Sequence, residues 1–129
     1  MNPMSRAVML AAMLSASTLS LAAEQKDAPK GGQVAFNNHC RTCHSVQPGD
    51  NRLGPNLHAI IGRKAGAEKE YAAYSQAMKS ADLTWDAATL EKFIADPEAV
   101  VRNNNMKPYK GIPDPGLRKE IVAYLKSIG

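Results

Sequence analysis

Apolar residues recur at helical spacing in the second half of the chain. Three of them fall at positions i, i+3 and i+4, which places them on one face of a helix; they are Leu90, Phe93 and Ile94. Thr84 or Asp86 can cap the start of this helix with a side-chain oxygen, and Pro97 is expected to close it. The pattern predicts an amphipathic helix that ends before residue 97.

The C-terminal segment carries the strongest helix signals of the chain. Asp114 is a suitable N-cap residue, and Pro115 fits the first position of a helix. Apolar residues then follow at intervals of four, four and three, so they share one face; they are Leu117, Ile121, Leu125 and Ile128. We predict a helix that starts after Asp114 and packs this face against the core.

The rest of the chain combines short helical segments with long loops. Residues 33–38 and 71–79 have the composition of helices, whereas residues 45–59 and 101–113 are rich in loop-forming Gly, Pro and Asn. No segment alternates apolar and polar residues as a strand does. We therefore predict an all-α fold of a few short helices joined by long loops. Such loops are uncommon in a small domain unless they serve a function, such as wrapping a ligand.

Residues 1–23 have the features of a secretory signal peptide. Arg6 precedes an apolar run over residues 7–14, and small residues at Ala22 and Ala23 suit a signal peptidase. The alternative is an uncleaved membrane anchor, but hydroxyl residues interrupt the stretch that would span the bilayer; they are Ser15, Ser17, Thr18 and Ser20. We predict a signal peptide over 1–23, one mature domain over 24–129, and a periplasmic location.

Composition limits both the core and the kind of partner. The 129 residues include only two Phe, one Trp and four Tyr, and small domains often need a cofactor or a covalent link for stability. The formal net charge is +4, from 16 basic and 12 acidic residues spread along the chain. This charge is too small and too dispersed to indicate nucleic-acid binding, although it permits contact with acidic partner surfaces.

Both cysteines of the chain lie in one short motif, C-R-T-C-H, at residues 40–44. This spacing is typical of covalent haem attachment, in which each thiol adds to one haem vinyl group and the adjacent imidazole binds the iron. We predict that Cys40 and Cys43 attach one haem c and that His44 is an iron ligand.

Three other uses of the motif are weaker. A redox-active dithiol belongs beside a βαβ unit, which the pattern lacks. A zinc site needs four ligands, and the chain has no second cysteine pair; His39 and His58 are weak substitutes. A structural disulfide would leave His44 unexplained.

An iron bound by His44 alone would be open to small molecules on its other side. A methionine thioether closes that side and raises the reduction potential. Outside the leader the chain contains Met78 and Met106. Met78 lies in a helical stretch, where methionine is usually core filler, whereas Met106 lies in a loop that can wrap the far face of a planar cofactor. Position therefore favours Met106 and leaves Met78 as the alternative.

Taken together, these residues resemble the class I cytochromes c over about residues 32–128. Gly32 and Phe36 are similar to the Gly-x-x-x-aromatic pair of the family's first helix. That helix crosses the last helix of the fold, where the matching residues are Ile121, Tyr124 and Leu125. The resemblance implies a cytochrome c fold, in which loops wrap one haem and the N- and C-terminal helices cross.

A long segment, residues 53–66, is very similar to the family's proline loop. By this likeness the carbonyl of Pro55 accepts the ring N–H of His44 and fixes the tautomer of that ligand. Met106 matches the family's sulfur ligand, which supports the assignment from position.

The resemblance also implies residues around the haem edge and its propionates. Three residues match those that hold a buried propionate: Arg63, Tyr74 and Trp85. Asn104 stands where a polar residue assists the other propionate, and Tyr109 is the candidate for the aromatic beside the haem edge.

The family implies an electron carrier rather than an enzyme, working in a respiratory or photosynthetic chain with both axial ligands kept in place. Such a carrier would be monomeric and would make small, short-lived contacts with acidic surfaces of redox partners, including membrane-bound complexes. Lys64, Lys107 and Lys110 are candidates for steering these partners, unless they are ordinary solubilising charges. Two alternatives stay open: a dedicated electron-acceptor subunit of a periplasmic dehydrogenase, and a haem-based peroxidase or sensor, which needs an open iron position.

Overall fold

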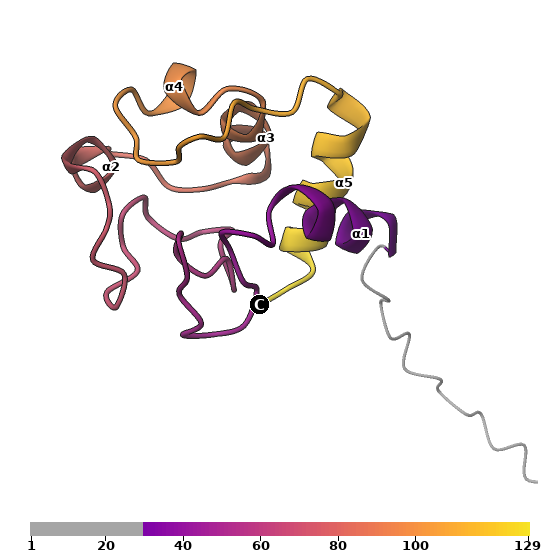
Figure 1. Ribbon diagram of the computed structural model, residues 1–129, viewed down its shortest axis with the longest axis horizontal. Helices are drawn as coiled ribbons and strands as arrows, with labels where there is room; N and C mark the ends of the chain where they lie inside the picture. The colour runs from indigo at the N-terminus through magenta and orange to yellow at the C-terminus, as the bar shows by residue number, and fades with distance from the viewer. Residues whose placement is uncertain (1–29) are drawn as a thin grey trace, which may run out of the picture.

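A computed structural model describes residues 30–129 of the chain. This part contains five α-helices: α1 (Lys30–His39), α2 (Gln76–Ser80), α3 (Ala87–Ala95), α4 (Pro97–Val100) and α5 (Pro115–Lys126). Long loops connect α1 to α2 and α4 to α5 (Figure 1). Residues 30–129 contain no strand, only an isolated bridge between Lys64 and Thr84. The predicted all-α fold is confirmed.

The predicted signal peptide, residues 1–23, lies outside the described residues, as does the start of the predicted mature domain. The longest described helix, α5, has 12 residues, and a bilayer span needs about 20. Among residues 30–129, no helix is therefore long and apolar enough to cross a membrane.

The terminal helices α1 and α5 cross in close contact (Figure 1). Gly32 permits this approach, because a Cβ at this position would overlap the backbone carbonyl of Glu120 and lie 2.7 Å from the Cβ of Tyr124. Phe36 packs against Tyr124, with ring centroids 5.6 Å apart. On α5, Ile121 is fully shielded from solvent. The crossing thus brings the predicted apolar face of α5 into the core.

The second predicted apolar stripe lies on α3, where Leu90, Phe93 and Ile94 are all buried. Asp86, rather than Thr84, caps this helix. Its side chain accepts a hydrogen bond of 2.7 Å from the backbone N–H of Thr89, which satisfies one of the donors left free at a helix start.

One helix start differs from the prediction, and one short helix was not predicted. α1 begins at Lys30 rather than at Gln33. Pro97 follows the end of α3 but also begins a further short helix, α4. Proline is favoured at the first position of a helix, and the side chain of Asp96 accepts from the N–H of Ala99 at 3.3 Å to cap it.

The predicted helix over residues 71–79 is mostly wrong. Only α2 forms there, after its N-cap Ser75, and residues 71–75 are not helical. The hydroxyl of Tyr71 instead donates to the backbone carbonyl of Leu53 at 2.7 Å. A contact between distant parts of the chain here overrides local helical propensity.

Asp114 is the N-cap of α5, and its Oδ1 accepts from the N–H of Gly116 at 2.7 Å and of Leu117 at 3.3 Å. Because losing such a cap costs about 1 kcal/mol, we expect Asp114→Ala to lower the free energy of unfolding by about that amount. Denaturant unfolding followed by circular dichroism measures it. The control is Asp82→Ala, which removes an exposed carboxylate that caps no helix. An equal loss in both variants would contradict the capping role.

Candidate functional site

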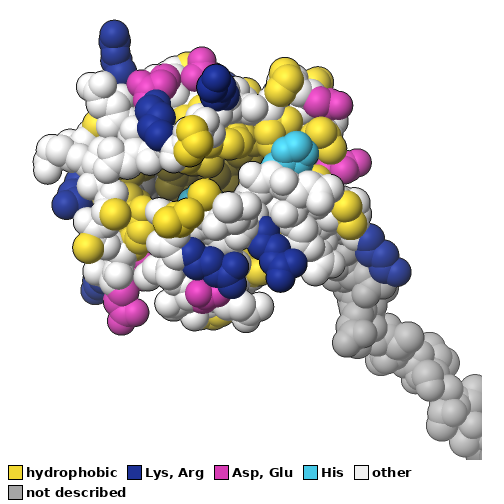
Figure 2. Space-filling view, in the orientation of Figure 1, with side chains coloured by type: hydrophobic (Ala, Val, Ile, Leu, Met, Phe, Trp, Pro, Cys, Tyr) yellow, Lys and Arg dark blue, Asp and Glu magenta, His cyan; other side chains and the backbone are white. Residues whose placement is uncertain are grey.

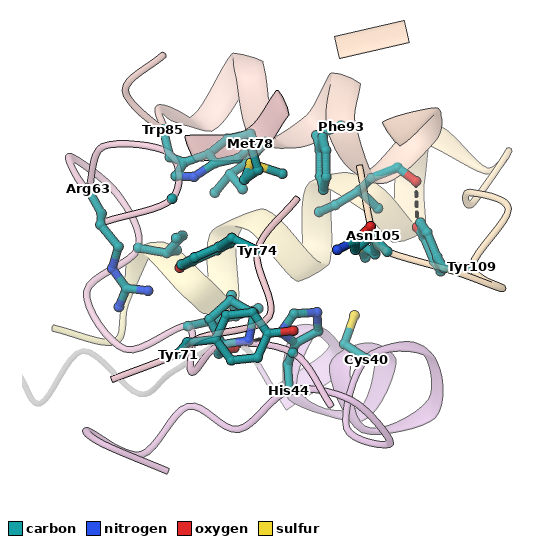
Figure 3. A pocket seen from close by; sticks show the side chains of 18 of the residues that line it. Cys40, His44, Arg63, Tyr71, Tyr74, Met78, Trp85, Phe93, Asn105 and Tyr109 are labelled. Carbon is teal, nitrogen blue, oxygen red and sulfur yellow. Dashed lines mark hydrogen bonds between the residues drawn. The ribbon is translucent and has the colours of Figure 1, made fainter. Parts of the chain in front are cut away.

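A deep apolar cavity lies between the helices and the long loops. Its empty space amounts to about 940 Å³, a volume that includes open solvent at the mouth, and most of its lining is apolar, as is usual for cofactor pockets. Figure 2 shows the opening as a hollow with apolar side chains in its depth. Cys40 and His44 lie on one side of the cavity, and Trp85 and Phe93 lie on the other (Figure 3).

His44 is held in one orientation at the cavity wall. It is 8% exposed, and its Nδ1 lies 2.7 Å from the backbone carbonyl oxygen of Pro55. A carbonyl oxygen only accepts, so Nδ1 carries the proton and donates it, which leaves Nε2 with the lone pair that a metal ion needs. Burial lowers the pKa of His44, more than the Pro55 contact raises it, and this favours the neutral ring.

Gly54 gives the imidazole the space it occupies. A Cβ at this position would overlap the ring of His44 at Cε1 and would lie 2.7 Å from Nδ1. Only glycine therefore lets the loop pass so close to the ring. The backbone N–H of Gly54 also donates to the carbonyl of Cys43 at 2.8 Å, which ties this loop to the cysteine motif.

A buried asparagine supports the same loop. Asn56 is 2% exposed, and its Nδ2 donates to the carboxylate of Glu68 at 3.1 Å. Arg63 donates to the backbone carbonyl of Asn56 at 2.6 Å and to that of His58. Because Asn56 directly follows Pro55, these bonds fix the carbonyl that accepts from the histidine ring.

Both cysteines are free thiols. Cys40 lines the cavity, whereas Cys43 is half-buried and lies outside its lining. Burial, with a smaller contribution from the neighbouring Cys43, raises the pKa of Cys40 to about 12. The backbone N–H of His44 donates to the carbonyl of Cys40 at 2.9 Å. This turn places a neutral thiol and the imidazole on the same side of the cavity.

Both candidate sulfur ligands reach the cavity, since Met78 and Met106 each line it. In Figure 3, Met78 lies on the same side as Trp85. Asn105, the neighbour of Met106, also lines the cavity, and in the view of Figure 3 it stands between Phe93 and Cys40. The structure thus brings the two methionines of the described chain to the cavity that holds the histidine.

Three residues that the resemblance associates with a propionate share this cavity: Arg63, Tyr74 and Trp85. The Tyr74 oxygen accepts from the N–H of Glu68 at 3.3 Å, so its own hydrogen is free to be donated. Burial raises the pKa of Tyr74, which keeps the hydroxyl protonated. Trp85 packs edge-on against Phe93, with ring centroids 4.9 Å apart.

Asn104 lies outside the cavity lining and is 3% exposed. Its Nδ2 donates to the carboxylate of Glu98 at 2.8 Å and to the carbonyl of Val101 at 2.9 Å, so both amide hydrogens are used within the protein. Its Oδ1 accepts from the N–H of Met106 at 2.9 Å. In this structure Asn104 therefore organises the loop that carries Met106.

Two tyrosines complete the wall. Tyr71, which the sequence did not single out, lines the cavity and meets Tyr74 edge-on at 4.8 Å. The only sequence signal for Tyr71 as a lining residue is its spacing of three residues from Tyr74. Because the composition of the segment favours a helix, this spacing does not stand out as a sign of a binding site. Tyr109 also lines the cavity, and its hydroxyl donates to the carbonyl of Ile94.

These residues fit a flat, mostly apolar cofactor that is bound covalently. One short segment presents a thiol and an imidazole, the lining contains thioethers, and Arg63 and Tyr74 place donors at the wall. Thiols add to haem vinyl groups, imidazole and thioether bind haem iron, and cationic or hydroxyl donors suit carboxylates. Fold and site together define a covalent haem protein.

Comparisons with known proteins identify the family. The solved structure of cytochrome cH from Methylobacterium extorquens has a TM-score of 0.68 and 39% sequence identity, covering 75% of this chain and 95% of that one. Cytochrome c2 iso-2 of Magnetospirillum molischianum is 39% identical over 102 residues, which are 79% of this chain and 98% of the relative. Cytochrome c2 of Rhodomicrobium vannielii is 35% identical over 121 residues, or 93% and 94% of the two chains. No family model matches the chain.

The chain belongs to the class I c-type cytochromes. It carries one covalently bound haem c and is an electron carrier, not an enzyme, that acts with redox partners. The family, fold and cofactor predicted from the sequence are confirmed.

Proposed function

We propose that this cytochrome is exported to the periplasm and moves single electrons between redox partners of a respiratory or photosynthetic chain. The haem c, attached through Cys40 and Cys43, supplies one centre that gains and loses a single electron. The observation that carries the proposal is the His44 ring, fixed by the Pro55 carbonyl in an apolar cavity that methionines also line. Such a site can keep both axial positions filled, which suits a carrier and hinders a peroxidase or sensor.

We propose that Nε2 of His44 and the sulfur of Met106 would bind the haem iron. The Pro55 carbonyl fixes the histidine tautomer and makes the ring a better base. The hydrogen bond from the Met106 N–H to Asn104 holds the backbone of the second ligand. Ligands that are held in advance need little rearrangement when the charge at the centre changes.

Arg63, Tyr74 and Trp85 are proposed to hold a propionate, because each lines the cavity and carries N–H or O–H donors; Arg63 has five such hydrogens, and its terminal nitrogens also donate to the carbonyls of Asn56 and His58. For Asn104 we propose a role in the Met106 loop instead, since both of its amide hydrogens have protein acceptors. The polar donors offset the cost of placing a carboxylate beside an apolar cavity.

Redox partners are proposed to dock transiently through acidic surfaces. Basic side chains stand above and below the hollow in Figure 2. Lys110 is exposed, while Lys64 and Lys107 are partly neutralised by Asp82 at 3.6 Å and Glu98 at 2.5 Å. Association should therefore slow as ionic strength rises, because salt screens these charges.

Expression with haem c maturation machinery tests the proposal. We expect a periplasmic product with an N-terminus close to Glu24, a mass that exceeds the polypeptide by one haem, and reversible reduction by one electron. Mass spectrometry and potentiometric titration measure these properties. The control is a variant with Cys40→Ala and Cys43→Ala, which should carry no covalent haem.

Other outcomes separate the alternatives. Wild-type protein without covalent haem would refute the proposal. One protein that stays bound through purification from the periplasm would indicate a dedicated acceptor subunit. Tight carbon monoxide binding or peroxide turnover by the wild type would indicate an open iron position, and hence a sensor or peroxidase.

A further inference from the structure

We propose that Glu98 is the positioning residue that holds the Met106 loop against the cavity, an inference that rests on Met106 being the sulfur ligand. Glu98 lies in α4, the short helix directly before this loop (Figure 1). It lies outside the cavity lining, so it acts on the site through other residues.

The carboxylate of Glu98 accepts hydrogen bonds from residues on both sides of Met106 in the sequence. Its Oε2 accepts from the backbone N–H of Asn103 at 3.1 Å. Its Oε1 accepts from Nδ2 of Asn104 at 2.8 Å and from Nζ of Lys107 at 2.5 Å. Hydrogen bonds to an ionised acceptor are stronger than neutral ones. One side chain of α4 therefore ties residues before and after Met106 to the helix.

Asn104 transmits this constraint to the ligand. It is 3% exposed, it donates to Glu98, and its Oδ1 accepts from the backbone N–H of Met106 at 2.9 Å. Without the Glu98 carboxylate, one hydrogen of a buried amide loses its acceptor. Buried polar groups without partners are costly, so the amide, then held only by its bond to the Val101 carbonyl at 2.9 Å, should hold the N–H of Met106 less firmly.

The backbone conformation of the loop also depends on Glu98. Asn103 has a φ of 63°, in the left-handed region that few residues adopt, and its N–H is the one that Glu98 accepts. Among residues 103–107, one other side-chain contact reaches a distant segment, from Nδ2 of Asn105 to the carbonyl of Ala73 at 3.1 Å. Glu98 and Ala73 thus hold the loop from two sides, and the Glu98 side includes the bond to the methionine backbone.

The test compares Glu98→Ala with Asp82→Ala in the haem-loaded protein. Asp82 is also an exposed, ion-paired carboxylate, but its partner is Lys64 and it contacts no part of the loop. In Glu98→Ala we expect the Met106 amide to exchange with solvent at least about tenfold faster, because its protecting bond opens more often. We also expect a weaker methionine–iron charge-transfer band in the oxidised protein and several-fold tighter binding of added imidazole. Asp82→Ala should match the wild type in all three measurements.

A second variant separates charge from hydrogen bonding. Glu98→Gln keeps one oxygen that can accept from Asn104, so its amide exchange and band should lie between those of the wild type and Glu98→Ala. A residue that contributes only to stability would leave the charge-transfer band unchanged, whereas it would speed amide exchange across the whole fold and not mainly at Met106.

Each outcome bears on one claim. Unchanged exchange of the Met106 amide in Glu98→Ala would overturn the proposal. Faster exchange of the Met106 amide with an undiminished charge-transfer band would also overturn it. Glu98 would then hold the loop backbone without positioning the methionine sulfur. If the Met106→Ala variant keeps the band, the assignment of Met106 as the sulfur ligand is wrong. The exchange rate of the Met106 amide in Glu98→Ala still decides separately whether Glu98 holds the loop.

Discussion

We expect Met106→Ala to abolish the methionine–iron charge-transfer band of the oxidised protein and to lower its reduction potential. The fall should be on the order of 0.2 V, within the range of about 0.8 V over which axial ligands set haem potentials. A thioether raises the potential of a haem, and alanine offers no donor in its place. Optical spectra and a potentiometric titration measure the two effects.

Met78→Ala is the matched control, because it removes the other thioether of the same cavity lining. Met78 is half-buried in α2, so its loss should reduce stability through lost packing and leave the band in place. The opposite result, with the band lost in Met78→Ala and kept in Met106→Ala, would assign the sulfur ligand to Met78.

Elements with strong local signals could be predicted from the sequence. α5 has a capping aspartate at Asp114, a proline at its first position and an apolar residue at each turn, and it forms where these signals place it. The stripe on α3 is buried for the same reason. In both cases the capping bond and the apolar face depend on residues within about four positions of each other.

Residues 71–75 could not be predicted in this way. Their composition favours a helix, but Tyr71 bonds to the carbonyl of Leu53 and Tyr74 receives the N–H of Glu68. Both tyrosines then line the cavity. Such hydrogen bonds join residues of irregular loops in the folded protein, and they leave no periodic pattern in the sequence.

The residues of the site also differ in how far the sequence predicts them. The cysteine motif predicts the cofactor by its spacing, and the cofactor is confirmed. The roles of the Pro55 carbonyl and of the propionate residues could be predicted only from the family resemblance, because no spacing rule links them to His44. The role of Glu98 could be predicted neither from motif spacing nor from the resemblance. Its three acceptor bonds reach into an irregular loop, where hydrophobic periodicity carries no information.

The crossing of α1 and α5 should be sensitive to added side-chain volume, and we expect Gly32→Ala to lower the free energy of unfolding by about 2 kcal/mol. Alanine gains up to about 1 kcal/mol over glycine in helix propensity. Its Cβ would overlap the backbone carbonyl of Glu120, however, and lie 2.7 Å from the Cβ of Tyr124. Backbone atoms cannot rotate away, so the helices must separate, and overpacking of this kind costs about 1–3 kcal/mol or more.

Gly31→Ala is the control, since it makes the same substitution one residue earlier in α1. There a Cβ would meet only the carboxylate of Glu120, at 3.3 Å, and this flexible side chain can move aside. The propensity gain should then dominate and leave stability equal to the wild type or up to about 1 kcal/mol higher. Denaturant unfolding of the haem-loaded proteins measures both changes. Effects of the same sign and size would show that Gly32 is not required for the close approach, and that the crossing tolerates a side chain where the helices meet.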